Sequence, residues 1–460
     1  MEIDQSSSLN PDDRSTGALW RISLPLMISN FASLFMIFID RIFLDYYSTS
    51  ALISATSSGT WAWAFLGGFG MIASMSEIFV AQYFGAKREQ TIGTAVWQMI
   101  WLSFFSIFVF LPLAFYAPPF LFRGEGSAAQ SDYFSYLLLF GPFYTLMSAL
   151  SGFYIGRGKT KILIYLAVLG NVLNIGLDGV FIFGVPSLFP EMGIKGAAIA
   201  TSLGYIFQAI TLFLLFLRPC HQHTFRTNHW RICPKLFYKS FRVGLPQGIF
   251  YMLEMMGFAI FYDLMSSASK DHIIISGICQ SFLILLSFFI EGLSRGVTAL
   301  SGNFIGAKEP RLVHQVLRSG IYLQCLFSLT IAIAFLMPSE WIMHLFPDAT
   351  RYILSAESGS SMSTLWICLF CSFLYLFFEG IRWVIAGILT AAGDTLFLLI
   401  AGSCSVWAFL IFPIYFLILQ NSLAIESAWA IFVAYSFISC SLYFWRFQKG
   451  CWQEIKLIEE

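Results

Sequence analysis

The sequence predicts an all-α integral membrane protein, with twelve transmembrane helices in two six-helix lobes. The first observation behind this prediction is composition: 58% of the 460 residues are hydrophobic and only 11% are charged, whereas a soluble domain carries about 25% charged residues. The second is the length of the apolar runs, because a bilayer core about 30 Å thick needs about 20 apolar residues per helix. The 26 basic and 26 acidic residues leave no positive excess for nucleic acid, so we expect partners in the lipid bilayer or among small molecules.

Twelve apolar runs of sufficient length follow one another along the chain. They cover residues 20–43, 52–79, 95–117, 133–155, 162–184, 195–217, 243–265, 273–297, 318–338, 362–387, 395–419 and 426–446. The predicted organisation is a cytoplasmic N-terminal tail (1–19), an N-lobe (20–217), a cytoplasmic linker (218–242), a C-lobe (243–446) and a cytoplasmic C-terminal tail (447–460). The connections are too short for a folded soluble domain, so we expect no enzyme; a membrane lipid or glycosyl transferase would need a larger catalytic loop.

Basic residues predict the orientation, because Lys and Arg concentrate in cytoplasmic loops. With the N-terminus inside, 19 of the 26 basic residues fall on the inner side, five on the outer side and two within spans. Both chain termini are therefore expected in the cytoplasm.

The two halves repeat short motifs in the same order, as transporter halves often do. Gly85-Ala86-Lys87 recurs as Gly306-Ala307-Lys308, and Leu24-Pro25 recurs as Leu245-Pro246, both with an offset of 221 residues. Gly158-x-Thr160 recurs as Gly393-x-Thr395 with an offset of 235 residues. Because each half has an even number of spans, the copies enter the membrane in the same direction, and the pseudo-twofold axis lies along the membrane normal.

Nucleotide hydrolysis has no support in the sequence. The loop 152–160, GFYIGRGKT, ends in Gly-Lys-Thr like a phosphate loop. That motif also requires a glycine five residues before the glycine that precedes its lysine, and this position is Phe153. It also joins two spans instead of a strand and a helix. We therefore expect no cofactor and energy from an ion gradient, with H⁺ or Na⁺ as the coupling ion.

Ionisable residues inside the spans are the functional candidates, because a charge in the membrane is expensive. In the outer half of the N-lobe these are Asp40, Asn174, Asp178 and Thr201, at similar depth, with Asn174 and Asp178 on one helix face. They form either a cage for a small cation, a carboxylate pair that takes a proton, or a polar cluster that holds helices together.

The C-lobe offers Glu254 in mid-span and Glu379 with Tyr375 one turn before it. Arg382 lies three residues after Glu379 and is a candidate ion-pair partner for it, whereas Glu254 has no basic residue on its own helix face. Glu254 is therefore the stronger candidate of the two for a mobile cation.

Three other charged positions have simpler interpretations. Glu291 and Arg295 are four residues apart and can pair on one helix face, and Glu77 falls near a hydrated inner boundary. The histidine-rich loop around His221 could suggest zinc, but its spacing matches no standard site and a basic linker is the favoured interpretation. We predict no bound structural metal.

The chain resembles the multidrug and toxic compound extrusion family of cation-coupled antiporters over roughly residues 17–447. The similarity lies in Leu24-Pro25, Asp40, AQYFGAKRE at 81–89, NVLNIGLDGVFIFG at 171–184, GIKGAAIAT at 193–201, GLPQGIFYMLE at 244–254, NFIGAKEP at 303–310 and FFEGIRWVIAGILTAAGDT at 377–395. The resemblance implies a V-shaped pair of lobes that exports amphipathic, often cationic small molecules in exchange for H⁺ or Na⁺ by alternating access.

The family's cation-coupling positions can be carried over one by one. The N-lobe set falls on Asp40, Asn174, Asp178 and Thr201, and the C-lobe set falls on Glu254, Tyr375 and Glu379. The chain departs from the family at Arg382 and at the Glu291/Arg295 pair. These departures question whether the C-lobe set holds a cation, and they leave room for a specialised substrate.

The resemblance also implies a monomer in a bacterial inner (plasma) membrane. The alternative function is a related lipid-linked sugar flippase or a dedicated metabolite exporter. Aromatic residues such as Trp61 and Trp63 could line a cleft for flat cations, or could simply pack against neighbouring helices or lipid.

Overall fold

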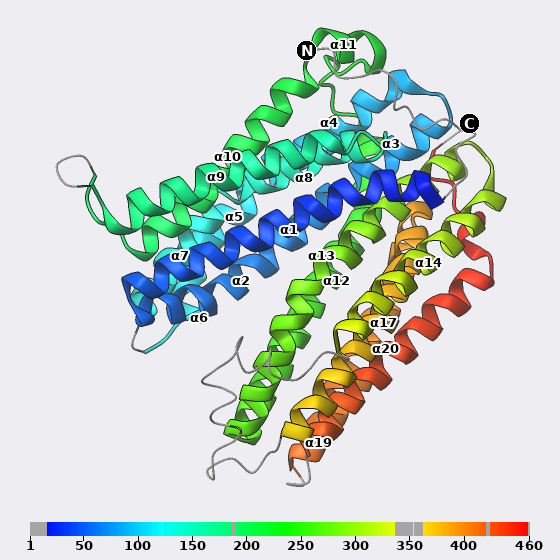
Figure 1. Ribbon diagram of the computed structural model, residues 1–460. Helices are drawn as coiled ribbons and strands as arrows, with labels where there is room; N and C mark the ends of the chain where they lie inside the picture. The colour runs from blue at the N-terminus through cyan, green and yellow to red at the C-terminus, as the bar shows by residue number, and fades with distance from the viewer. Residues whose placement is uncertain are drawn as a thin grey trace.

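The computed structural model describes residues 16–124, 126–185, 189–335, 353, 362–419 and 424–458. Helices account for nearly all of them, and the first ten form an N-lobe (Figure 1). These are α1 (Thr16–Tyr47), α2 (Thr49–Ala73), α3 (Ser76–Gly85), α4 (Glu89–Phe105), α5 (Ile107–Tyr116), α6 (Pro118–Leu121), α7 (Ser127–Leu139), α8 (Gly141–Ile155), α9 (Lys161–Phe183) and α10 (Ile194–Phe216).

A short helix, α11 (Pro219–Phe225), lies in the connection to the C-lobe. The C-lobe contains α12 (Pro234–Ala268), α13 (Lys270–Gly306), α14 (Pro310–Phe335), α17 (Met362–Ala392), α18 (Thr395–Val406), the π-helical segment η2 (Trp407–Ile411), α19 (Phe412–Leu419) and α20 (Ile425–Gln448). A 3₁₀ turn, η3 (Cys451–Gln453), follows. The end of the predicted ninth span (336–338) and most of the predicted N-terminal tail (1–15) lie outside the described residues.

The predicted membrane spans are confirmed. Eleven helical stretches in the described residues are long and apolar enough to cross a membrane, and the bent pair α7 and α8 makes up to twelve. That pair bends by 42°. The second helix has a proline, Pro142, in its first turn. Because proline lacks a backbone donor and clashes with the preceding turn, α7 cannot continue straight into α8.

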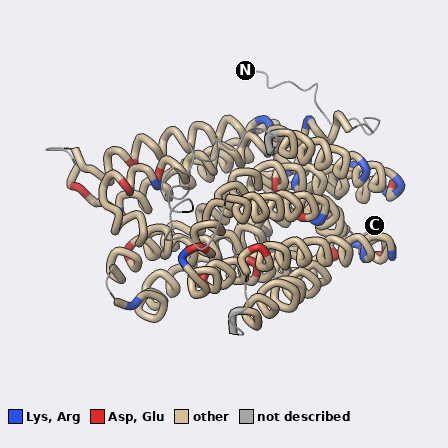
Figure 2. The backbone as a smooth tube through the Cα atoms, turned by 60° about the horizontal axis from the view of Figure 1, so that its bottom comes forward, with Lys and Arg blue, Asp and Glu red and all other residues tan. Residues whose placement is uncertain are grey.

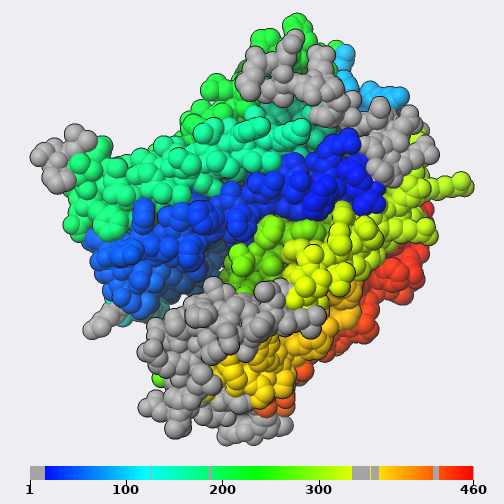
Figure 3. Space-filling model, in the orientation of Figure 1, coloured from blue at the N-terminus to red at the C-terminus, as the bar shows by residue number. Residues whose placement is uncertain are grey.

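The two lobes meet at one end of the molecule and diverge toward the other, as Figures 1 and 3 show. The meeting end carries the repeated Gly-Ala-Lys turns. A Cβ on Gly85 would overlap the carbonyl oxygen of Asn303, and a Cβ on Gly306 would overlap the carbonyl oxygen of Gln82. Each Gly-Ala-Lys turn is thus pressed against the other lobe, and only glycine allows this close approach.

The side chains at this junction repeat the same symmetry. Gln82 donates to the carbonyl oxygen of Ala391 at 2.7 Å, and Asn303, 221 residues later, donates to the carbonyl oxygen of Gly156 at 3.0 Å. Lys87 and Lys308 both adopt left-handed backbone conformations, with φ of 57° and 60°. The internal repeat read from the sequence is therefore a structural repeat.

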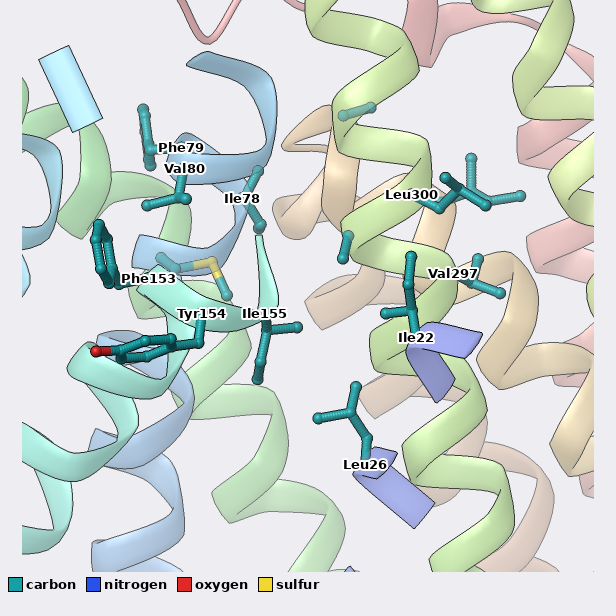
Figure 4. Packing of buried hydrophobic residues seen from close by; sticks show 14 of the residues in the cluster. Ile22, Leu26, Ile78, Phe79, Val80, Phe153, Tyr154, Ile155, Val297 and Leu300 are labelled. Carbon is teal, nitrogen blue, oxygen red and sulfur yellow. The ribbon is translucent and has the colours of Figure 1, made fainter. Parts of the chain in front are cut away.

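The largest hydrophobic cluster lies at the same junction and contains residues of both lobes. Figure 4 shows Phe153 and Ile155 of α8 near Ile78 and Val80 of α3, with Val297 and Leu300 of α13 on the other side. Basic residues gather mainly toward the end of the molecule that carries the C-terminus, whereas the helix middles are mostly uncharged (Figure 2). This is the end that the sequence predicts to be cytoplasmic.

Candidate functional site

The four polar residues predicted in the N-lobe come together in the folded protein. Asp40 lies on α1, Asn174 and Asp178 lie on α9, and Thr201 lies on α10. Their exposed fractions are 8%, 0%, 0% and 4%. The Thr201 hydroxyl donates to Oδ2 of Asp40 at 3.4 Å, and the Asn174 amide donates to the Thr201 hydroxyl at 3.5 Å. We call these residues the N-lobe cluster.

Close helix packing brings these residues together. A Cβ on Gly204 of α10 would lie 3.3 Å from the carbonyl oxygen of Gly170 and 3.4 Å from Cβ of Asn174 on α9. The small residue therefore lets α9 and α10 approach closely, one turn beyond Thr201, as small residues do between membrane helices. The i, i+4 spacing of Asn174 and Asp178 then directs both toward Thr201 and Asp40.

The N-lobe cluster has more hydrogen-bond acceptors than donors. Among the described residues, Oδ1 of Asp40, Oδ1 of Asn174 and both carboxylate oxygens of Asp178 are buried without a hydrogen-bond partner. Neither Asp40 nor Asp178 forms an ion pair with a described basic residue, and Arg41, the next residue after Asp40, is exposed. Because a buried unpaired acceptor is costly, these oxygens are suited to take up a hydrogen bond, a proton or a small cation.

The C-lobe polar residues form a second cluster around Arg382. Its Nε donates to Oε2 of Glu379 at 2.9 Å, its Nη2 donates to Oε1 of Glu254 at 3.0 Å, and Nη2 also contacts Oε1 of Glu379. Nη1 lies 3.4 Å from the hydroxyl of Tyr443. The exposed fractions of Arg382, Glu254 and Glu379 are 2%, 5% and 6%. We call Glu254, Glu379, Arg382 and Tyr443 the C-lobe cluster.

Two sequence-based expectations for this lobe are decided by these contacts. The predicted ion pair between Glu379 and Arg382 is confirmed. Glu254 has no basic residue on its own helix face, as expected, but the guanidinium of Arg382 reaches it from α17, 128 residues along the chain. The reason for preferring Glu254 over Glu379 as a site for a mobile cation is therefore lost. Helical spacing indicates only neighbours on the same helix, so the sequence could not reveal this contact. The signal in the sequence that could have indicated this contact was Arg382 itself, an arginine within a predicted span.

Tyr375 lies next to the C-lobe cluster without hydrogen-bonding to its carboxylates in the part of the chain that the structure describes. The ring is buried and packs against Phe432, with 4.4 Å between the ring centroids. Trp383 instead donates its indole N–H to Oε1 of Glu379 at 2.7 Å. Trp383 was not among the predicted site residues.

A third ion pair joins the two lobes. Nη2 of Arg295 on α13 lies 3.1 Å from Oε2 of Glu77 on α3. Arg295 therefore takes its ion-pair partner from α3 and not from its own helix, although the charge of Glu291 also interacts with it. The hydrated-boundary interpretation of Glu77 is wrong, because Glu77 is 3% exposed. The partner lies 218 residues away in the chain, beyond the reach of a helix-face argument.

The histidine-rich linker is packed against the N-lobe. Nδ1 of His221 lies 2.8 Å from the carbonyl oxygen of Leu215, and its ring packs against Phe153. Burial, together with the nearby charge of Arg157, lowers the pKa of His221 to about 4, so the ring is uncharged at neutral pH. Within the described ranges no group of three or more His, Cys, Asp or Glu side chains is arranged to hold a metal ion.

The aromatic residues proposed for a cleft divide into two kinds. Trp61 is 42% exposed. Trp63 packs edge to face with Tyr144 and Tyr205, at centroid separations of 5.4 Å and 5.9 Å. Trp63 thus belongs to an aromatic group inside the N-lobe, and Trp61 is the more accessible ring.

The two helical lobes are related by an internal repeat, and each buries a polar cluster among helices long enough to span a membrane. This is the architecture of a repeat-built membrane protein of the secondary-transporter type. The MatE family model matches residues 25–180 and 246–417, one segment in each lobe. The chain belongs to the MatE family, and the resemblance noted in the sequence is confirmed.

Named relatives support this assignment. The chain is 25% identical over 448 residues to a probable multidrug resistance protein NorM of Thermotoga maritima, covering 95% of this chain and 93% of that protein. It is 25% identical over 304 residues to the multidrug resistance protein NorM of Vibrio cholerae, covering 64% and 65% of the two chains.

Solved structures share the fold. A eukaryotic MATE transporter matches with a TM-score of 0.81 at 18% identity, covering 95% of this chain and 96% of that one. A MOP superfamily transporter from Pyrococcus furiosus matches with a TM-score of 0.79 at 17% identity, covering 96% and 97%. The latter is described as having a binding pocket of reverse polarity that suggests a different function.

Proposed function

We propose that the protein is a secondary transporter that exports amphipathic, often cationic small molecules in exchange for H⁺ or Na⁺. The observation that carries this proposal is the pair of buried carboxylates in the N-lobe, Asp40 and Asp178, which have acceptors to spare and no basic partner among the described residues. The names of the relatives, multidrug resistance proteins, support the substrate class.

In this mechanism the coupling ion binds at Asp40 and Asp178, with Asn174 and Thr201 as neutral polar neighbours. Protonation, or Na⁺ binding, removes the repulsion between the two carboxylates and draws α1 toward α9 and α10. Because α1 also packs along α13 of the C-lobe at Gly292 and Gly296, a shift of α1 changes the contact between the lobes. That coupling connects ion binding to alternating access.

The membrane setting belongs to the same proposal. The lobes meet at the end rich in basic residues, which we assign to the cytoplasm together with both chain termini, so the lobes diverge toward the outside (Figures 1 and 2). We assign the protein to a bacterial inner membrane, as a monomer.

Efflux of a fluorescent cationic dye tests this function. Ethidium-loaded vesicles that contain the protein are monitored while the pH gradient and the Na⁺ gradient are collapsed separately. We expect efflux to stop with one collapse and to persist with the other, which names the coupling ion. Efflux that depends on neither gradient would contradict the proposal.

A second candidate function is export of a dedicated metabolite or flipping of a lipid-linked sugar. What supports it is the likeness in fold to the Pyrococcus furiosus transporter, whose binding pocket of reverse polarity is said to suggest a different function. The two arginines within the spans do not add to this support, because Arg295 and Arg382 are already paired with carboxylates. This function would be favoured if vesicles containing the protein exported an anionic or sugar-linked substrate but retained ethidium.

A further inference from the structure

The C-lobe cluster does not have the composition of an open cation site. The family resemblance places a coupling cation at Glu254, Tyr375 and Glu379. In the folded protein the guanidinium of Arg382 contacts one oxygen of Glu254 and both oxygens of Glu379. Tyr375 is turned toward aromatic packing with Phe432. Of the expected cation ligands, Glu254 and Glu379 are therefore already bound to Arg382, and Tyr375 is not part of this hydrogen-bond network.

We propose that Arg382 is a built-in cation that fills the C-lobe cluster and restricts ion coupling to the N-lobe cluster. The inference rests on the proposed function, because it concerns which carboxylates of an ion-coupled exporter carry the ion. Arg382 is then the residue that determines where the mobile ion binds.

The chemistry of the guanidinium supports this role. Arginine remains protonated under all physiological conditions and presents its donors as a rigid planar fork. The Nε, Nη1 and Nη2 atoms of Arg382 donate hydrogen bonds to Glu379, the Tyr443 hydroxyl and Glu254, respectively. A Na⁺ ion needs several oxygen ligands, and at this position it would also face a positive charge at contact distance.

The surroundings hold the guanidinium in place. Trp383 donates to Glu379 at 2.7 Å, and the Tyr443 hydroxyl lies 3.3 Å from the carbonyl oxygen of Leu398. The arginine itself is 2% exposed. Contacts from α12, α17 and α20 thus hold Arg382 between the two carboxylates.

The contrast with the N-lobe cluster is direct. There two buried carboxylates have three oxygens without a partner, and no described arginine or lysine reaches them. One lobe therefore buries carboxylates with their own cation, and the other buries carboxylates that must obtain one from solution.

Na⁺-dependent thermal unfolding tests the proposal without requiring transport. The background is the N-lobe double variant, Asp40→Asn with Asp178→Asn, which removes the other site. The purified protein is melted in NaCl and in choline chloride at equal ionic strength. With Arg382 present, we expect the same Tm in both salts. With Arg382→Gln added, we expect Tm to rise with Na⁺ concentration, by about 2 °C or more near saturation.

Two matched variants identify the source of the shift. In Arg382→Gln combined with Glu254→Gln and Glu379→Gln, which we call the C-lobe neutral variant, the Na⁺ response is expected to disappear. Arg295→Gln, which removes another arginine within a span, is expected to produce no Na⁺ response. The proposal would be overturned if the protein that retains Arg382 showed a Na⁺-dependent rise in Tm and lost this rise when Glu254 and Glu379 were replaced. A folded Arg382→Gln protein without any Na⁺ response would also overturn it.

A second measurement keeps the proposal testable if Arg382→Gln alone does not fold. The C-lobe neutral variant with its N-lobe carboxylates intact buries no charge at this position. We expect its dye efflux to keep the gradient dependence of the unmodified protein, whereas loss of that dependence in a folded variant would overturn the proposal. If the unmodified protein moves no dye at all, the proposed function fails, and the unfolding experiment still decides the role of Arg382.

Discussion

The two lobes bury their carboxylates in opposite ways. In the N-lobe, Asp40 and Asp178 have a hydroxyl and an amide nearby and leave three carboxylate oxygens without a partner among the described residues. In the C-lobe, Glu254 and Glu379 share the guanidinium of Arg382. Because a buried charge must be compensated, we propose that the first arrangement obtains its cation from outside the protein, whereas the second contains one.

Some contacts at the junction between the lobes, by contrast, are repeated. At the junction the lobes are closely alike: Gln82 and Asn303 make corresponding hydrogen bonds, and Lys87 and Lys308 adopt the same left-handed conformation. The repeat therefore keeps the contact that the lobes share and lets the buried polar sites diverge. On the proposed function, the repeated junction is common to both lobes, while the coupling ion binds in the interior of only one.

The largest expected effect is loss of coupled transport on neutralising the N-lobe cluster. With Asp178→Asn, the cluster loses one of the two carboxylates proposed to bind the coupling ion, so we expect gradient-driven dye efflux to fall to the level of protein-free vesicles. The matched control is Asp132→Asn, because Asp132 is a partly exposed residue of the same lobe that pairs with Lys195 at 3.2 Å. Normal coupled efflux by Asp178→Asn would contradict the claim that the N-lobe cluster, unlike the C-lobe cluster, binds the coupling ion.

The next effect is on stability in the C-lobe. Arg382→Met leaves two carboxylates buried without their cation, which is expected to destabilise the protein by about 3 to 5 kcal/mol. Denaturation of the purified protein in the absence of Na⁺ measures the change. The C-lobe neutral variant should recover most of the loss, because it has no charge left to compensate. Equal stability of Arg382→Met and the unmodified protein would show that the guanidinium does not compensate the carboxylates.

A smaller effect is expected at the ion pair that joins the lobes. Arg295→Gln leaves Glu77 without its charged partner and should weaken the closed junction by about 1 to 3 kcal/mol. Accessibility of a single cysteine placed at the inner end of α13 reports the opening. Glu77→Gln should have an effect in the same direction, and the double variant should change accessibility by less than the sum of the two. Strict additivity would mean that the two side chains do not interact.

The smallest effect concerns the neutral members of the N-lobe cluster. Thr201→Val removes the hydrogen bond to Asp40, worth about 1 kcal/mol. We therefore expect about a fivefold change in the ion concentration that half-saturates efflux, with the maximal rate retained. Thr211→Val is the control, since the Thr211 hydroxyl donates within its own helix to the carbonyl oxygen of Phe207 and makes no other hydrogen bond among the described residues. A complete loss of transport in Thr201→Val would assign Thr201 a larger role.

Much of the fold was predictable because it follows from local patterns. Apolar runs located the spans, and the recurrence of Gly-Ala-Lys at 85–87 and 306–308 revealed the repeat. The N-lobe cluster was also predictable, because Asn174 and Asp178 share a face and Asp40 and Thr201 lie at the same depth on their own spans.

The rest depends on contacts between distant parts of the chain. The partner of Glu254 is Arg382, 128 residues away, and the partner of Arg295 is Glu77, 218 residues away. Neither distance has a periodic signature in the sequence. The bend between α7 and α8 was missed for a different reason, since both halves are apolar and hydropathy alone does not show that Pro142 starts a new helix.

Ion movement driven by dye is the most direct test of the account. Proteoliposomes contain the unmodified protein, the N-lobe double variant or the C-lobe neutral variant, and a trapped indicator of the coupling ion is followed when a dye gradient is imposed. We predict that dye drives ion movement with the unmodified protein and with the C-lobe neutral variant, but not with the N-lobe double variant. Ion movement that survives in the N-lobe double variant and disappears in the C-lobe neutral variant would contradict the account.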